Sequence, residues 1–259
     1  MKDLLQHADE MPVTLVVAIA YGTLAVVTKM FGPAEQFAEN LHRFGMLTPQ
    51  LVTAGEPWRL LTYAFLHGNA LHLVFNLMML FGIGPQLERT LGSVRFAALY
   101  VVTAVGGGLM VCLTQPFQQA VVGGSGALFG MLGCAVALLM RSGRHSFAFL
   151  EFEGPRRLMA MIVANLVIGF LLPFVSNSGH IGGLLTGFAF TLFWLAPGRQ
   201  RSPLRLAWRA VVLLLFVSAG FASLVPVTRA DYLAGAALAA QGERREQLER
   251  AFFEVTTRR

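Results

Sequence analysis

The chain is poor in charged residues, and this shortage excludes most soluble classes of protein. Only 13% of its 259 residues are charged, whereas 55% are hydrophobic, and a typical soluble domain carries about 25% charged residues. The mean hydropathy is correspondingly high, at +0.61. We therefore expect an integral membrane protein.

Cysteine is also scarce, and its scarcity excludes a disulfide framework. The two cysteines, Cys112 and Cys134, both lie in apolar segments and show neither a CxxC motif nor metal-ligand spacing. We expect both to be buried as small hydrophobic side chains. Alternating short strands, the pattern of a membrane barrel, are absent as well, so no sheet is expected.

What the chain does have is long, continuous apolar runs. A helix needs roughly 20 mostly apolar residues to cross a hydrocarbon core of about 30 Å, and seven candidate runs are present. We predict an all-α, polytopic transmembrane helix bundle. The runs are 12–31, 70–87, 93–114, 125–140, 158–176, 179–196 and 208–226.

These runs and the segments between them predict four regions. We expect residues 1–11 to form a cytoplasmic N-terminus and residues 12–196 to form a six-helix membrane domain that carries the function. Residues 197–227 form a basic loop with a seventh transmembrane helix, and residues 228–259 form a helical tail.

The net charge of +6 is distributed among loops and does not form one basic face. Arginines gather between runs two and three, four and five, and six and seven, which by the positive-inside rule makes those loops cytoplasmic. The N-terminus is then inside and the tail outside. No nucleic-acid partner is expected.

Three segments combine polar side chains with apolar surroundings. HGNALHLVFN contains His67, His72 and Asn76, and the other two segments centre on Ser125 in VVGGSGALFG and His180 in NSGHIGGLLTGF. His72 and Asn76 are four residues apart and share one helix face. The predicted topology puts all three segments near the outward ends of their helices, so they can converge. Such groups at membrane depth are functional candidates, because burying them is costly.

Ser125 follows Gly123 and Gly124 in a turn that opens a helix, where close backbone approach and unpaired N–H donors suit an oxyanion. A serine is a weak nucleophile alone, and His180 can accept its proton if the two helices pack closely. No Asp or Glu lies at that depth, so we predict a Ser-His dyad. The motif is not the GxSxG elbow of soluble hydrolases, since Ala127 replaces the last glycine.

Other readings of the same residues stay open. His72 and Asn76 either donate to the oxyanion or merely bond between helices, and His67 either orients the site or supports the outer loop. Ser125 alone is more typical of helix packing. A metal site built from His67, His72 and His180 would lack a carboxylate or fourth ligand, so we expect no metal.

With these motifs in place, the chain resembles the rhomboid family of intramembrane serine proteases. The resemblance covers most of residues 55–195. The residues that carry it are Trp58, Arg59, the His67, His72 and Asn76 of HGNALHLVFN, Glu88, Gly92, the Ser125 of GGSG, and the His180, Gly183 and Gly187 of GHIGGLLTG.

The resemblance implies a six-helix core with a water-filled cavity and a catalytic pair formed by Ser125 and His180. It also implies that the amide of Ser125, together with His72 and Asn76, surrounds the oxyanion. The seventh run is similar to the six-plus-one arrangement of some members. Phe129 stands where some members have tyrosine, which keeps the ring for packing and loses the hydroxyl.

The implied activity is cleavage of single-pass transmembrane protein substrates in the lipid bilayer, near their outward end, without a cofactor. We expect a bacterial cytoplasmic (inner) membrane location. Two other functions were considered: a non-catalytic substrate binder or chaperone, and a small transporter. The presence of both Ser125 and His180 disfavours the first, and the lack of an acidic residue in the outer half and of an inverted repeat disfavours the second.

Overall fold

The computed structural model describes residues 8–114, 120–142, 176–195 and 243–257, together with Val163, Val167 and Ala237. The seventh predicted run, nearly all of the fifth and the first part of the tail lie outside the described residues. The division into four regions therefore stays a prediction.

Within the described ranges the protein is all-α, as predicted, and the single β-type pairing there is an isolated bridge between Leu47 and Val121. The elements in order are η1 (Ala8–Glu10), α2 (Pro12–Val27), α3 (Ala34–Arg43), α4 (Pro49–Thr53), α5 (Arg59–Thr62), η2 (Tyr63–Phe65), α6 (Ala70–Leu91), α7 (Ser93–Thr114), α8 (Ser125–Ser142), α10 (Asn177–Phe190), the π-helical turn η4 (Thr191–Leu195) and α13 (Glu243–Thr257).

Some helices end at a different residue from the apolar run that predicted them, because local backbone geometry and not hydropathy determines where the helix ends. α7 matches its run, but α2 ends at Val27, because the Thr28 hydroxyl donates to the Leu24 carbonyl at 2.7 Å and Lys29 adopts a φ of 59°. α6 continues to Leu91 and ends before Gly92, whose φ of 80° suits glycine. The predicted end of the first run was therefore four residues too far along the chain.

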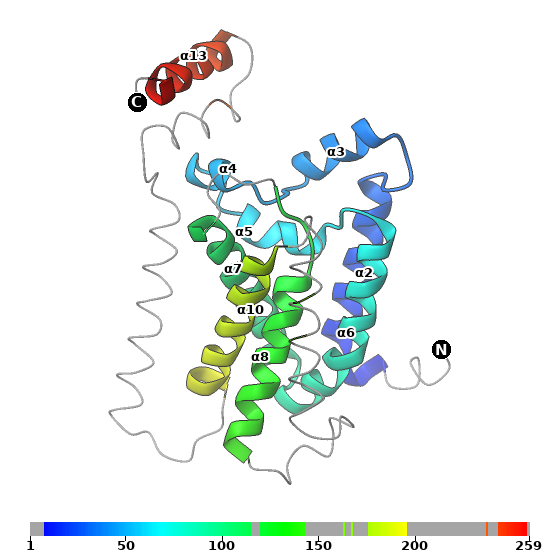
Figure 1. Ribbon diagram of the computed structural model, residues 1–259. Helices are drawn as coiled ribbons and strands as arrows, with labels where there is room; N and C mark the ends of the chain where they lie inside the picture. Colours follow the sequence, from blue (N-terminus) through cyan, green and yellow to red (C-terminus); the bar gives the residue numbers. More distant parts are fainter. Residues whose placement is uncertain are drawn as a thin grey trace.

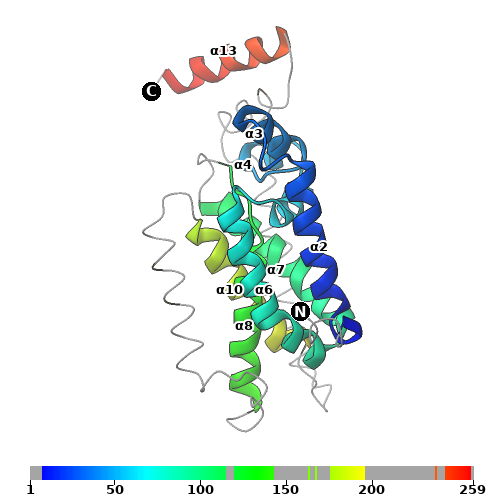
Figure 2. The same cartoon turned by 90° about the vertical axis from the view of Figure 1, so that its right-hand side faces the viewer.

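The long helices α2, α6, α7, α8 and α10 run beside one another as a bundle (Figures 1 and 2). α6, α8 and α10 begin at the same end of it, the end at which α3 and α4 lie, whereas α2 begins at the opposite end (Figure 1). The sequence predicted this arrangement from the alternation of loop charges. It brings the three polar segments to one level of the bundle.

The bundle has an apolar core that also encloses several polar groups, and unlike a soluble protein it exposes large apolar side chains on its outside. Buried groups include Arg59, Asn76, Glu88 and His180, whereas large apolar side chains are exposed along α2 and α6. Such an exposed apolar surface fits lipid contact. α6 and α7, with 22 residues each, are long and apolar enough to cross a membrane, and α2 and the apolar part of α8 are shorter.

α8 and α10 approach so closely that only glycine fits between them. A Cβ added to Gly183 would overlap the Gly126 carbonyl group, and one added to Gly187 would overlap that of Gly130. Gly183 and Gly187 therefore serve the packing of α10 against α8. The backbones themselves set the distance between the two helices.

The segment between α2 and α6 is held by Arg59, which is buried although it is charged. Its guanidinium Nη1 donates to the carbonyls of His42 at 2.9 Å and Met46 at 2.8 Å, and its Nε pairs with Glu56 at 2.5 Å. These contacts tie the end of α3 to the start of α5. Arg59 therefore supports the loop that covers the polar end of the bundle.

Candidate active site

Ser125 and His180 meet across the α8–α10 contact. Ser125 is the first residue of α8 and His180 lies in the first turn of α10, and Ser125 Oγ and His180 Nε2 are 2.8 Å apart. The Ser176 side chain caps α10 by accepting from the Gly179 amide at 3.4 Å. The two side chains proposed from sequence as a dyad are thus within hydrogen-bond distance.

The His180 ring is oriented by stacking. Phe129, one turn beyond Ser125 on α8, lies parallel to it with ring centroids 4.2 Å apart and an interplanar angle of 5°. Nδ1 of His180 has no hydrogen-bond partner in the part of the chain that the structure describes. Among the described residues no carboxylate bonds to the His180 ring, and the Phe129 phenyl ring stacks against it.

The turn before α8 depends on glycine. Gly123 has a φ of 129°, which other residues rarely adopt, and its amide donates to the Tyr63 carbonyl at 3.0 Å. A Cβ added there would come within 2.5 Å of His72 Cε1 and 2.6 Å of His72 Nε2. The His72 imidazole therefore lies directly against the turn that carries Ser125.

Asn76 lies one turn beyond His72 and is buried. Its Nδ2 donates to the His72 carbonyl at 2.8 Å, and its Oδ1 has no partner among the described residues. One N–H of the Asn76 amide is thus used on the backbone of its own helix, which leaves a second N–H. Asn76 shares a helix with His72, and the structure records no contact of its side chain with Ser125.

His67 lies behind His72 in the connection before α6. Its ring is 4.5 Å from that of Tyr21 and 5.2 Å from that of His72, measured between centroids. Burial lowers the pKa of His67 to about 3, and the neighbouring His72 adds to this effect. His67 is therefore neutral at ordinary pH, and its ring packs against that of His72.

Three buried tyrosines behind the site were not predicted from the sequence. They are Tyr21 in α2, Tyr63 in η2 and Tyr100 in α7. The sequence does contain a signal for them. The chain has four tyrosines, and two of these three fall within apolar runs, where a hydroxyl needs a hydrogen-bond partner. Which partner each one has depends on the rotation of its helix, and that is not visible in the sequence.

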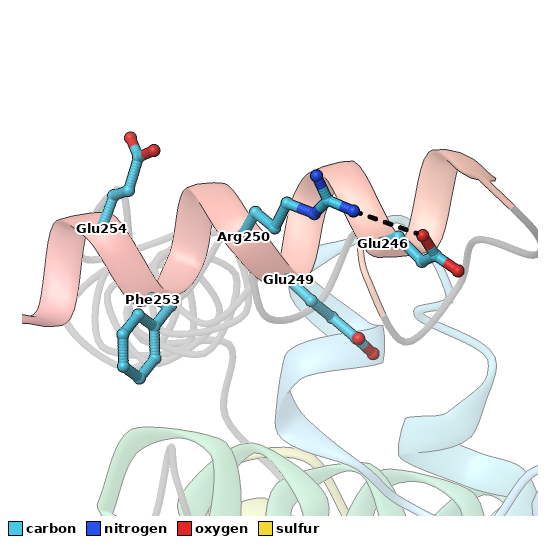
Figure 3. A pocket seen from close by; sticks show the side chains of 5 residues that line it. All are labelled: Glu246, Glu249, Arg250, Phe253 and Glu254. Carbon is cyan, nitrogen blue, oxygen red and sulfur yellow. Dashed lines mark ion pairs between the residues drawn. The ribbon is translucent and has the colours of Figure 1, made fainter.

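Elsewhere in the described residues, neither metal ligands nor a hollow on α13 forms a second candidate site. Among the described residues no three His, Cys, Asp or Glu side chains are grouped so that they could hold a metal ion. A shallow hollow on α13 is lined by Glu246, Glu249, Arg250, Phe253 and Glu254, and its Arg250 pairs with Glu246 at 3.6 Å (Figure 3). It contains no nucleophile and is typical of a solvated helix face.

Comparison with known proteins shows which family the chain is similar to. Residues 54–197 match the model of the Rhomboid domain. The chain is 43% identical over 150 residues to RHOMBOID-like protein 5 of Arabidopsis thaliana, an alignment that covers 58% of this chain and 48% of the relative. It is also 39% identical over 150 residues to Rhomboid protease GluP of Bacillus subtilis, covering 58% of this chain and 28% of the relative.

A longer alignment extends the similarity toward the ends of the chain. Rhomboid-like protease 1 of Toxoplasma gondii is 30% identical over 203 residues, which cover 74% of this chain and 66% of the relative. The chain thus spans about half or less of the first two relatives. The matched region contains every element of the site except α2, which supplies Tyr21.

Proposed function

The chain belongs to the rhomboid family, and on that premise we propose that it is an intramembrane serine endopeptidase. It cleaves transmembrane protein substrates near the outward membrane face through a Ser-His dyad. The observation that carries this proposal is the 2.8 Å separation of Ser125 Oγ and His180 Nε2. The two residues are 55 positions apart in the sequence, and the packing of α8 against α10 brings a nucleophile and a base together.

In the first step the Ser125 hydroxyl attacks the scissile carbonyl carbon, and its proton passes to His180 Nε2. This requires the tautomer in which Nδ1 of His180 carries the hydrogen. The parallel Phe129 ring restrains the imidazole in the plane needed for this transfer. The resulting imidazolium then protonates the leaving amine.

The oxyanion forms beside the start of α8. The first bond there of the i to i−4 type runs from the Leu128 amide to the Gly124 carbonyl, so the preceding amides, including that of Ser125, are not used by such bonds. His72 lies against Gly123 and supplies a side-chain donor. Asn76 supplies its remaining N–H after a small reorientation, since the first is bonded to the His72 carbonyl. Losing one such donor typically costs about 100-fold to 1000-fold in rate.

In the second step water hydrolyses the acyl-enzyme, with His180 accepting a proton from the water and returning it to Ser125. The polar groups around Ser125 lie at the end of the bundle that the loop charges assign to the outward side. Water therefore reaches the site from that side, and no cofactor takes part in the reaction.

The lipid bilayer and single-pass transmembrane proteins are the proposed partners. We also propose a bacterial cytoplasmic membrane, and the distribution of arginines among the loops supports an N-terminus in the cytoplasm. The relatives come from a plant, from Bacillus and from Toxoplasma, so family membership alone does not select one membrane.

The test is cleavage of a tagged single-pass substrate by the purified full chain in liposomes. Ser125→Ala and His180→Ala should each reduce kcat by more than about ten-thousand-fold, because each removes one half of the dyad. Ser93→Ala, at the start of α7, and His42→Ala, an exposed histidine in α3, are the matched controls and should remain active. Chelators should leave the rate unchanged.

Cleavage by both dyad variants at the parental rate would refute the mechanism. Loss of activity under chelation, restored by added metal, would instead favour the alternative in which the histidines bind a metal ion.

A further inference from the structure

Two of the three buried tyrosines are joined by their hydroxyl groups. The Tyr21 and Tyr100 hydroxyl oxygens are 2.9 Å apart, and the Tyr100 hydroxyl donates to the Ala64 carbonyl at 3.2 Å. Each phenol has a single hydrogen to donate. Since Tyr100 uses its hydrogen on Ala64, Tyr21 is the donor to Tyr100. The chain of bonds therefore runs from α2 through α7 to the segment before α6.

This pair lies against the residue that precedes the nucleophile. A Cβ added to Gly124 would overlap the Tyr21 hydroxyl and would lie 3.0 Å from the Ala64 carbonyl oxygen. Gly124 is therefore enclosed by the same two groups that the hydrogen-bond chain connects. Any movement of the Tyr21 hydroxyl changes the space available to the peptide that leads into Ser125.

Tyr63 closes the other side of the turn. Its carbonyl accepts from the Gly123 amide at 3.0 Å, and its hydroxyl donates to the Ala104 carbonyl at 2.9 Å. That hydroxyl also lies 3.0 Å from where a Gly126 Cβ would be. The Tyr63 hydroxyl is thus anchored to α7, and the segment that includes Ala64 cannot drift away from the turn.

The Tyr21 ring also reaches the histidines. Its edge contacts His67 at 4.5 Å between centroids, and His67 contacts His72 at 5.2 Å. One side chain of α2 therefore lies behind both the nucleophile turn and the ring proposed to bind the oxyanion, although α2 supplies no group to the reaction itself.

We propose that the Tyr21–Tyr100 hydroxyl pair is a positioning device for the nucleophile, which holds the Gly124–Ser125 peptide so that Ser125 Oγ stays in line with His180. This inference rests on the proposed protease function. Removing either hydroxyl leaves the rings in place but frees the turn on one side. Catalysis is sensitive to such freedom, since a misplacement of about 1 Å can cost about 100-fold in rate.

The test compares Tyr21→Phe, Tyr100→Phe and the double variant of the full chain in liposomes. Each single change should lower kcat about tenfold, within the range set by partial misplacement, and leave KM within about twofold. The double variant should be no slower than the slower single variant, because both changes break the same chain of bonds. Thr14→Val is the matched control on α2, because it removes a buried hydroxyl that bonds to Glu88 in the first turn of that helix. It should lower Tm and leave kcat unchanged.

Amide hydrogen exchange read by mass spectrometry gives a measure that does not depend on activity. Peptides containing residues 123–126 should exchange several-fold faster in Tyr21→Phe and Tyr100→Phe than in the parent or in Thr14→Val. Parental kcat and parental exchange in both tyrosine variants would overturn the positioning role. If the parent itself fails to cleave, the protease proposal is refuted, and the exchange data still decide whether the tyrosines hold the turn.

Discussion

The contact between α8 and α10 and the contact between α2 and α6 are built in opposite ways. α8 and α10 touch backbone to backbone, with Gly183 and Gly187 of α10 against the carbonyl groups of Gly126 and Gly130 of α8. α2 and α6 are joined through side chains, above all the carboxylate of Glu88. A geometry that must keep a serine and a histidine 2.8 Å apart is thus placed where main-chain atoms fix the spacing.

The Glu88 carboxylate is the cap that the sequence of α2 lacks. No side chain caps α2 at Met11, and instead Glu88 accepts from the amides of Val13 and Thr14 and from the Thr14 hydroxyl, each at 2.8 Å. These amides are among the unpaired donors at a helix start, where a negative charge is also favoured by the helix dipole. The α2–α6 contact therefore supplies stability, whereas the α8–α10 contact supplies geometry.

Among the substitutions that test this difference between the two helix contacts, Gly183→Ala should have the largest effect, which is on kcat. The new Cβ would overlap the carbonyl group of Gly126, the residue after Ser125, and a backbone cannot give way as a flexible side chain can. The helices must separate, so we expect kcat to fall by about 100-fold or more. The measurement is substrate cleavage in liposomes at a temperature well below Tm.

Gly22→Ala is the matched control for this substitution. A Cβ on Gly22 in α2 meets no atom within 4 Å in the part of the chain that the structure describes. Alanine in a helix interior is favoured over glycine by roughly 0.5–1 kcal/mol, so this variant should be as active as the parent and no less stable. Equal activity of Gly183→Ala and Gly22→Ala would remove the distinction between the two contacts.

Glu88→Gln should have the next largest effect, and on stability alone. Glutamine has one acceptor oxygen where the carboxylate has two, so at least one buried donor of α2 loses its partner, at a cost of about 1–3 kcal/mol. Tm should fall while kcat at 25 °C stays near the parental value, because Glu88 lies in the last turn of α6 whereas Ser125 begins α8, and these two helices begin at the same end of the bundle (Figure 1). Thermal unfolding in detergent, followed by circular dichroism, measures the shift.

The neighbouring ion pair provides the control for Glu88. Arg89 Nη1 lies 3.1 Å from Glu10 Oε2, with side chains that are 46% and 43% exposed. Exposed pairs contribute about 0–1 kcal/mol, so Arg89→Gln should shift Tm much less than Glu88→Gln. A tenfold loss of kcat in Glu88→Gln would show that the α2–α6 contact also controls the geometry of the site.

The sequence predicts the dyad better than it predicts the surroundings of the dyad. Ser125 and His180 were identifiable because polar groups are costly at membrane depth, and the loop charges placed both at one level. Tyr21 was missed because α2 is apolar on nearly all sides, so periodicity does not indicate which face turns inward. For the same reason, the sequence does not indicate that the Tyr21 hydroxyl contacts the hydroxyl of Tyr100, 79 residues away.

The ends of the helices also show how far the structure can be predicted from the sequence. Hydropathy continues past Val27 into Met30 and Phe31, and so predicted a longer first helix than the structure has. The end is decided by the Thr28 hydroxyl bond and the positive φ of Lys29, which are local geometric events that hydropathy does not encode. At the end of α6, by contrast, the sequence does contain a local signal, because the helix ends at a glycine, Gly92.

His67 lies between Tyr21 of α2 and His72 of α6, and the effect of replacing it should be the smallest and should depend on pH. Burial lowers its pKa to about 3 from the usual 6.5. Between these values the unfolded chain binds a proton that the folded chain does not, so the free energy of unfolding falls as the pH falls from 6.5 toward 3.

His67→Phe keeps a ring between Tyr21 and His72 but cannot be protonated. Its Tm should therefore drop by a few degrees less than that of the parent between pH 7 and pH 4.5, measured in the same detergent, whereas His42→Phe, at an exposed position, should follow the parent. Parallel Tm curves for the parent and His67→Phe would mean that His67 is protonated without cost in the folded state, and that α2 and the histidines are less tightly packed than the ring distances indicate.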